Sequence, residues 1–265
     1  MQLRAYDSIV VTLMTAESID TSRLSPILPL TAPSKIPDVL QIMVQLDSEL
    51  EPAGLAHVRP FNSIYRGLTE EVGYGINSGR FSQPNTVERT VGIFALKYLD
   101  ELGRYAKGNR AEVSKSWSKL FYDPAVASAP EGVQFLLGMF AHIKLDLPQA
   151  LCTSEVTDDY YGDYREIVGD MIDATAHKLA PQYVPGPRFI SKKITSYAVR
   201  GIANWREKAW TNGLMLQNAN ADGDEAKSNK IVDLLDVNTA RRSGAMLKVG
   251  GLAIHTIDRL MLSAA

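Results

Sequence analysis

The sequence feature that most constrains the fold is an apolar stretch from Phe135 to Leu147 that two ionisable side chains interrupt. Apolar residues occupy almost every side of a helix built from this stretch, which is typical of a helix enclosed by other helices. His142 and Asp146 are four residues apart, so both project from one face of that helix and can share a hydrogen bond. Because a buried imidazole or carboxylate costs free energy unless it is paired, we expect this pair to have a structural or a chemical role.

Pro148 predicts that this central helix bends or ends just after Asp146. Proline lacks a backbone N–H and disfavours helical geometry in the residue before it, which is Leu147. We therefore expect the carboxylate to lie where the helix opens. Residues 147–151 are expected to continue as a further turn at a new angle.

Length and charge favour one domain that binds neither nucleic acid nor a membrane. The 265 residues are enough to bury a large core, and no stretch resembles a hinge between two domains. Hydrophobic residues make up 45% of the chain and the net charge is −2, an ordinary globular balance. Without a basic run, this balance argues against nucleic acid and against an anionic membrane as the main partner.

The sequence also favours a cytoplasmic location. The single cysteine, Cys152, cannot form an internal disulfide, which agrees with a reducing compartment. The longest apolar runs contain Gly, His or Lys well before about 18 residues, so we expect no transmembrane span. Asp7 and the lack of a small-residue cleavage pattern argue against a signal peptide. The oligomeric state stays open, a homo-oligomer included.

Helical periodicity predicts an all-α fold, an irregular single-domain bundle of roughly eight to ten helices around the central buried helix. No alternating strand pattern and no fixed-period repeat is found. Residues 1–34 are expected to form a peripheral segment, and residues 218–265 to form C-terminal helices that Gly250-Gly251 interrupts. The predicted helices cover residues 7–17, 36–50, 60–77, 86–106, 115–122, 130–147, 164–179, 191–217, 226–237, 240–249 and 252–262.

Several motifs together resemble a family of uncharacterised, mostly actinobacterial, all-helical proteins. The most specific motif is Gly138-Met139-x-Ala141-His142-Ile143-x-x-Asp146-Leu147-Pro148-x-Ala150-Leu151. The others are Phe61-Asn62-x-x-Tyr65-x-x-x-Thr69-x-x-Val72, Glu88-Arg89 ahead of Phe94 and Tyr98, and Trp205-Arg206-x-x-Ala209-Trp210. The resemblance covers residues 36–217 and implies an all-helical core, but it brings no activity with it.

Two departures from that family concern the central helix. The resemblance implies asparagine at the positions of Phe140 and Lys144, and this chain has neither. If two amides and a histidine form a polar site in the family, an aromatic ring here replaces one amide and a cation replaces the other. These changes suggest a specialised relative, such as an enzyme recruited to a biosynthetic pathway.

Two interpretations of His142 and Asp146 stay open at this point. In the first, the pair is a satisfied buried contact that fixes the central helix against its neighbours. In the second, Asp146 sets the imidazole tautomer and raises its basicity, so that His142 acts as a general acid or base. The candidate substrate contacts around the pair are Asn62, Tyr65, Thr69, Tyr98, Trp117, Phe140, Lys144, Arg206 and Trp210.

A metal site has weaker support than proton transfer. The four histidines form no HExxH pattern, and paired cysteines are absent, so no zinc spacing is present. Acidic residues before or along a helix are more often capping or solvated side chains than metal ligands. The remaining candidate ligands are Asp170, Asp173 and His177 on one helical face, and Asp158, Asp159 and Asp163, which superficially resemble the aspartate-rich motif of terpene cyclases.

The sequence therefore favours a small-molecule enzyme without a redox cofactor. We expect an apolar substrate, polyketide-, terpenoid- or lipid-like, and acid/base or conformational catalysis such as cyclisation or isomerisation. No cofactor is expected, because the chain has no glycine-rich strand-to-helix turn for a dinucleotide. The lack of a GxSxG elbow argues against a Ser/His/Asp nucleophile. The alternatives are a non-catalytic carrier of a lipid-like ligand and a divalent-metal-dependent hydrolase.

Overall fold

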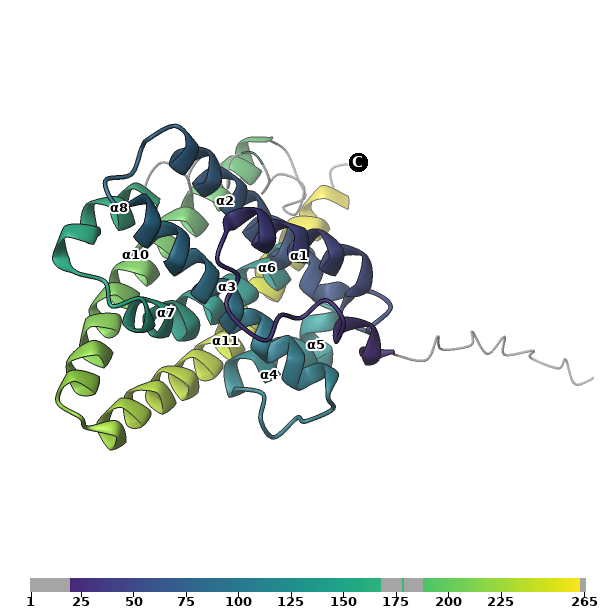
Figure 1. The fold of residues 1–265 in the computed structure, drawn as a ribbon. Helices are drawn as coiled ribbons and strands as arrows, with labels where there is room; N and C mark the ends of the chain where they lie inside the picture. The colour runs from purple at the N-terminus through teal and green to yellow at the C-terminus, as the bar shows by residue number, and fades with distance from the viewer. Residues whose placement is uncertain (1–19, 168–177, 179–187, 263–265) are drawn as a thin grey trace, which may run out of the picture.

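Every regular element of the computed structural model is a helix within residues 20–167, 178 and 188–262, which are the residues it describes. The predicted all-α fold is confirmed, and the helices pack into one body (Figure 1). The elements are η1 (Thr21–Leu24), α1 (Ile36–Glu49), η2 (Ala56–Val58), α2 (Arg59–Asn77), α3 (Pro84–Ala106), α4 (Lys115–Tyr122), α5 (Pro124–Ala127), α6 (Glu131–Ala141), η3 (His142–Asp146), α7 (Leu147–Thr153), η4 (Asp158–Tyr160), α8 (Tyr161–Glu166), α10 (Arg188–Ala221) and α11 (Glu225–Leu262).

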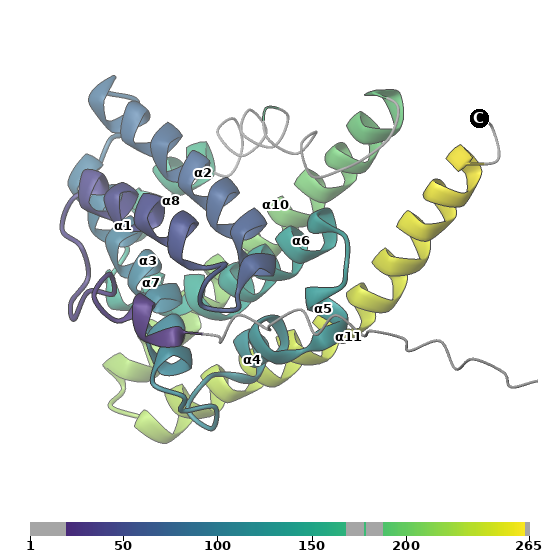
Figure 2. The same cartoon turned by 90° about the vertical axis from the view of Figure 1, so that its right-hand side faces the viewer.

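The central helix predicted from the apolar stretch is present as the consecutive elements α6, η3 and α7. Every side chain from Leu137 to Pro148 is buried. Helices α2, α4 and α11 pack against α6, while α3 and α10 pack against α7. Figure 2 shows α11 running along the edge of the body, past α4. The all-round apolar pattern of the stretch thus reflects neighbours on all of its sides.

The sequence predicts that the central helix bends or ends just after Asp146; the helix does not end there, but widens into the π-helical turn η3 and continues as α7. In that turn the N–H of Leu147 bonds to the carbonyl of His142, five residues earlier. A proline ring in an α-helix meets the carbonyl four residues before it, so a wider turn just ahead of Pro148 relieves that conflict. Leu147 keeps helical dihedral angles, φ −61° and ψ −43°, and the chain continues as α7.

Two glycines allow neighbouring helices to approach the central helix closely. A Cβ atom on Gly138 of α6 would lie 2.6 Å from the Cβ of Phe61 on α2. A Cβ atom on Gly213 of α10 would lie 2.9 Å from the Cβ of Leu151 on α7. Because real Cβ contacts are longer than this, only glycine permits these helix crossings without displacement.

Acidic side chains close the N-termini of neighbouring helices. Glu88 on α3 accepts the backbone N–H of Ile36, the first residue of α1, at 3.3 Å. Asp163 on α8 accepts the N–H groups of Ser82 and Gln83, just before α3, at 2.8 and 2.6 Å. A carboxylate near unpaired N–H groups at a helix start is stabilising, so these contacts fix how the helices dock.

The C-terminal prediction was wrong, because α11 is one continuous helix rather than three. It runs from Glu225 to Leu262, through Gly250 and Gly251. A glycine inside a helix costs only about 1 kcal/mol relative to alanine, which the helix-forming residues around it offset. The predicted helix at 7–17 and most of the one at 164–179 lie outside the described residues.

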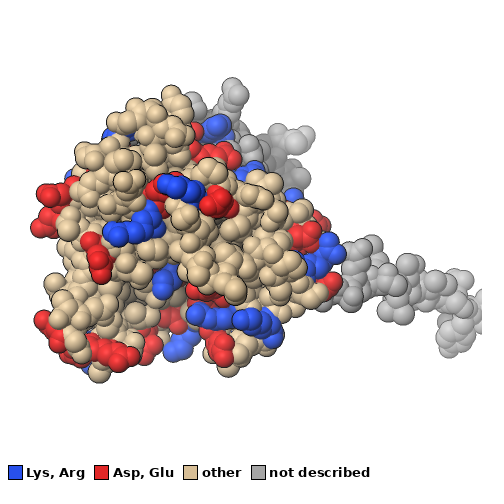
Figure 3. Space-filling view, in the orientation of Figure 1, with Lys and Arg blue, Asp and Glu red and all other residues tan. Residues whose placement is uncertain are grey.

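The surface carries charges of both signs. On the face shown in Figure 3, lysine and arginine side chains alternate with aspartate and glutamate. Within the described ranges, no helix is long and apolar enough to cross a membrane.

Candidate functional site: a buried histidine–aspartate pair beside a cavity

His142 and Asp146 form the hydrogen-bonded pair that their spacing predicted. Nδ1 of His142 lies 2.8 Å from Oδ2 of Asp146, and the two residues are 0% and 2% exposed. The indole Nε1–H of Trp117 donates to the same carboxylate oxygen at 3.0 Å. Two N–H groups can thus converge on one oxygen, an arrangement that favours the ionised carboxylate as acceptor.

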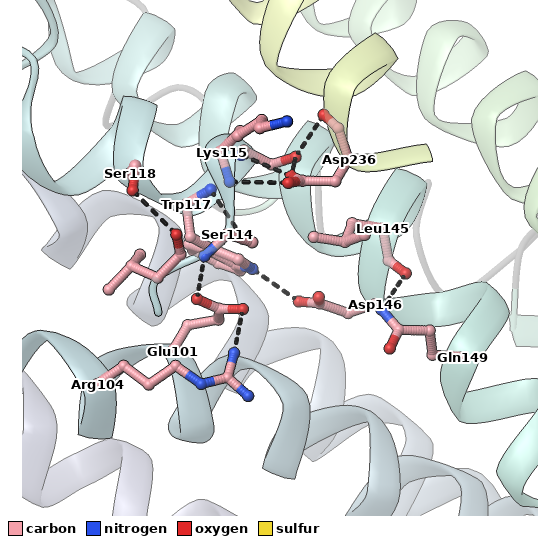
Figure 4. Close-up of polar contacts among 12 residues, drawn as sticks. Glu101, Arg104, Ser114, Lys115, Trp117, Ser118, Leu145, Asp146, Gln149 and Asp236 are labelled. Carbon is pink, nitrogen blue, oxygen red and sulfur yellow. Dashed lines mark hydrogen bonds and ion pairs between the residues drawn. The ribbon is translucent and has the colours of Figure 1, made fainter. Parts of the chain in front are cut away.

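Acidic residues of two other helices hold the start of α4, the helix that carries Trp117 (Figure 4). Asp236 on α11 accepts the backbone N–H groups of Lys115 and Ser116 at 2.9 and 2.8 Å. Glu101 on α3 accepts the N–H of Ser114, the residue before α4, at 2.9 Å. These contacts satisfy free N–H groups at the start of α4 and so fix the helix that carries the indole.

Aromatic rings enclose the His142 imidazole. The ring of Phe94 stacks on it with a centroid distance of 3.6 Å and an interplanar angle of 7°. The rings that meet it at steeper angles, with centroid distances of 4.5 to 6.1 Å, belong to Phe61, Tyr65, Tyr98 and Trp117. This shell excludes water from both faces of the imidazole.

The enclosure keeps the imidazole neutral. Burial lowers the pKa of His142 well below its ordinary value, and the positive charge of Arg206 lowers it further. Burial raises the pKa of Asp146 well above its ordinary value, although the Trp117 N–H opposes this shift. Because the indole N–H of Trp117 already makes Oδ2 an acceptor, we place the proton between His142 and Asp146 on Nδ1, which leaves Nε2 of His142 as a bare acceptor.

A cavity of about 50 Å³ borders the imidazole. Its lining is mostly apolar and comes from α2, α3, α6, η3, α7, η4, α8 and α10, together with Ile167 just after α8. Of the residues predicted to contact a substrate, Tyr65, Thr69 and Arg206 line this cavity beside His142. Asp146 does not line it, so the carboxylate can act on a guest only through the imidazole.

Four buried polar atoms around this cavity have no hydrogen-bond partner among the described residues. They are Nε2 of His142, Nε of Arg206 and the hydroxyl oxygens of Tyr65 and Thr90. The Arg206 guanidinium also lacks a carboxylate partner within the same ranges, and it lies 5.0 Å from the ring centre of Tyr164. Buried polar groups without partners are costly and rare in proteins. Four of them on one cavity indicate a place for a polar group of a guest molecule.

Two predicted contact residues, Tyr98 and Trp117, belong to the ring shell rather than to the cavity lining. Asn62 lies further away and ties α2 to α1. Its side-chain amide donates to the carbonyl of Met43 at 2.9 Å and to the carboxylate of Asp47 at 2.6 Å. These three residues support the site by positioning helices and rings.

The remaining predicted contacts lie on other sides of the central helix. The ring of Phe140 packs against Trp205 with a centroid distance of 4.7 Å. Trp210 packs against Tyr164 at 5.0 Å. Lys144 lines a separate cleft with α10 and α11. The two positions where the family resemblance implies asparagine are therefore not part of the cavity.

Of the residues considered as metal ligands, only Asp158, Asp159 and Asp163 are described by the structure, and they form no metal site. Asp163 caps α3, while Asp158 and Asp159 are exposed on η4. Asp170, Asp173 and His177 lie outside the described residues. In the part of the chain that the structure describes, no three His, Cys, Asp or Glu side chains form a group that could hold a metal ion.

Sequence reasoning missed several residues of the site. Thr90, Tyr160 and Tyr164 line the cavity from α3, η4 and α8. Tyr160 and Tyr164 are spaced four residues apart in an acidic stretch, a signal that could have marked one helical face. Glu101 could have been found because it follows Tyr98 by three residues and therefore lies beside the apolar stripe of the helix.

The fold and site define an all-helical protein with a neutral, carboxylate-held histidine beside a small cavity. The chain belongs to a family of unknown function (DUF5995), and the match covers residues 36–249. This confirms the resemblance at the level of the family. The match extends beyond residue 217, the predicted limit, into α11. No curated protein and no solved structure matches the chain.

Proposed function

We propose that this protein is a small-molecule enzyme in which His142 moves a proton to or from a substrate bound in the cavity. The observation that carries the proposal is the bare Nε2 atom of His142, buried at the cavity without a partner among the described residues. A structural histidine would be expected to use both ring nitrogens, because an unmade buried hydrogen bond costs about 1–3 kcal/mol.

The geometry supports a division of roles among three side chains. Asp146 accepts the Nδ1 proton, which orients the ring and stabilises the imidazolium that forms when Nε2 takes a proton. Negative charge left on the substrate would be stabilised by the guanidinium of Arg206 and by the hydroxyl of Tyr65. Returning the proton to another substrate atom completes an isomerisation, or a cyclisation that ends in proton transfer, without a co-reactant.

The size of the cavity restricts the substrate. A water molecule occupies about 30 Å³ of liquid, so 50 Å³ accommodates a group of only a few non-hydrogen atoms. The proposed substrate therefore presents a small reacting group here, with an oxygen or an anionic end for Arg206. A polyketide- or terpenoid-like substrate in a biosynthetic pathway, which the sequence favours, would require the lining side chains to move apart.

The proposal can be tested before the substrate is identified. The purified protein is incubated with a small-molecule extract of its source organism, and metabolites that change are identified by mass spectrometry. We expect the wild type to convert at least one compound and His142→Gln to convert none. His57→Gln is the matched control, because His57 is buried against the carbonyl of Leu120 and does not line the cavity.

The outcome also separates the enzyme from a carrier, which the mostly apolar lining of the cavity would also suit. A carrier would retain a small molecule through purification, visible by native mass spectrometry, and would alter no compound in the extract. Conversion by His142→Gln at the wild-type rate would show that the imidazole takes no part in the chemistry.

A further inference from the structure

A second cleft lies beside the central helix, with a lining quite different from that of the cavity. Lys144 follows His142 by two residues on η3, but it faces α10 and α11 instead of the cavity. Lys208 on α10 and Arg242 on α11 lie in the same cleft. Three separate elements thus bring three cations to one concave site.

The charges of this cleft are not balanced by the protein. No aspartate or glutamate lines it among the described residues. None of the three cations forms an ion pair or a side-chain hydrogen bond with a described residue. The rest of the lining includes neutral groups that can donate hydrogen bonds, among them Thr211, Asn212 and Asn238.

Lys144 is the residue that distinguishes this cleft from an ordinary solvated surface. Lys208 and Arg242 are exposed, so water alone could satisfy them. Lys144 is only 8% exposed, and burial together with the nearby charges of Lys208 and Arg242 lowers its pKa. The protein encloses most of the Lys144 side chain, and the residue lines the cleft together with Lys208 and Arg242, so a bound anion would offset the repulsion among the three positive charges.

We propose that Lys144, Lys208 and Arg242 bind the phosphate group of a small phosphorylated molecule in this cleft. A phosphate monoester carries close to two negative charges and several acceptor oxygens, which three cations and the neutral donors around them match. The cleft has a volume of about 320 Å³, close to the lower end of small-ligand sites, about 300–1,000 Å³. It therefore has room for the phosphate and a small organic part. This site is separate from the proposed catalytic cavity.

Inorganic phosphate is the probe for the first experiment. The melting temperature and the Kd of the full chain are measured with millimolar phosphate, with sulfate, and with chloride at matched ionic strength. We expect phosphate to raise the melting temperature and chloride to have no comparable effect. Lys144→Gln and Arg242→Gln should each weaken phosphate binding by about tenfold or more, because each removes a charge-assisted hydrogen bond.

Lys230→Gln is the matched control, since Lys230 is exposed on α11 and lies outside the cleft. It should bind phosphate as the wild type does. Equal phosphate affinity in Lys144→Gln and the wild type, or equal effects of phosphate and chloride on the wild type, would overturn the proposal. A sugar phosphate that binds more tightly than inorganic phosphate would identify a monoester as the ligand, whereas equal affinities would identify free phosphate.

A second readout keeps the test informative if a variant changes stability. Without added anion, Lys144→Met should raise the melting temperature, because it replaces a charge that two cations repel with an apolar group on a mostly buried side chain. With phosphate, the melting temperature of the wild type should rise above that of Lys144→Met, because only the wild type gains stability from binding. A Lys144→Met variant that melts below the wild type without anion would show that Lys144 stabilises the fold, contrary to a binding role.

Discussion

The chemistry available to this protein depends on how single side chains satisfy one another around Asp146. One carboxylate oxygen accepts from both Trp117 and His142, so the aspartate holds the imidazole and the indole together. The imidazole is left with one nitrogen committed and one free. This division is the reason that a pair with a structural contact can also serve in proton transfer.

Substitutions of Asp146 should separate shape from charge. Asp146→Ala leaves two buried N–H groups without an acceptor, each at about 1–3 kcal/mol, so we expect a loss of about 2–6 kcal/mol in the free energy of unfolding. Asp146→Asn can place its amide oxygen where Oδ2 lies, so that both N–H groups keep an acceptor and only the charge is lost; it should therefore lose less than half as much. Urea denaturation measures both, and equal losses would show that the hydrogen bonds contribute little.

The elements of the fold are fixed by close helix crossings and by caps supplied from other helices. The spacing of apolar residues predicts most of the helices, because a helix of 3.6 residues per turn buries one face. Such spacing does not predict the π-helical turn η3, because α and π hydrogen bonds differ by one residue and the neighbours decide between them. Nor does it predict which helices meet, so Asp236, more than a hundred residues after Lys115, could not be recognised as its cap.

The crossing of α2 and α6 should be sensitive to a single methyl group. Gly138→Ala places a Cβ atom 2.6 Å from Phe61, so we expect a loss of about 1–3 kcal/mol in the free energy of unfolding. Gly162→Ala is the control, because a Cβ atom there meets no atom within 4 Å and alanine favours the helix α8. Thermal or urea unfolding measures both. Equal effects would contradict the close contact.

The cap that Asp236 of α11 provides for the start of α4 should also stabilise the fold. Asp236→Ala frees the N–H groups of Lys115 and Ser116, so we expect a loss of about 1–2 kcal/mol in the free energy of unfolding. Asp233→Ala, an exposed position on the same helix, should change stability by less than about 0.5 kcal/mol. Asp236→Ala that unfolds like the wild type in urea would argue against the cap.

At the scale of the whole molecule, buried ionisable groups couple folding to pH. The fold class followed from the sequence, whereas the site followed only in part: His142, Asp146, Tyr65, Thr69 and Arg206 were found. Thr90, Tyr160 and Tyr164 line the cavity from elements distant in sequence from the central helix, and local spacing does not show which elements meet. Glu101 is buried, and the charge of Asp146 acts on it. Its carboxyl group therefore makes the free energy of unfolding depend on pH.

Glu101 should destabilise the folded protein as pH rises. Burial, and then the charge of Asp146, raise the pKa of Glu101 from 4.5 to about 7. The folded state therefore holds the proton of the Glu101 carboxyl group more tightly than the unfolded state does. The stability that this proton contributes is fully present below about pH 4.5 and is lost as pH rises to about 7. The shift corresponds to about 3 kcal/mol.

Comparison with Glu101→Gln isolates this effect from other titrating groups. The free energy of unfolding of the wild type, minus that of Glu101→Gln, should fall by about 2–3 kcal/mol between about pH 5 and pH 8. Urea denaturation at both pH values measures it. A difference that stays constant or rises would show that Glu101 is ionised in the folded protein throughout this range.

The protonation state of the His142 imidazole tests the proposed site most directly. Nitrogen-15 NMR of the histidine side chains, with His142 assigned from the His142→Gln variant, reports which ring nitrogen carries a proton. We predict one proton on Nδ1 and a bare Nε2 as the pH falls through 6.5, the ordinary imidazole pKa, because burial lowers the pKa of His142. An imidazole that gains a second proton near its ordinary pKa, or one that carries its proton on Nε2, would contradict the site described above.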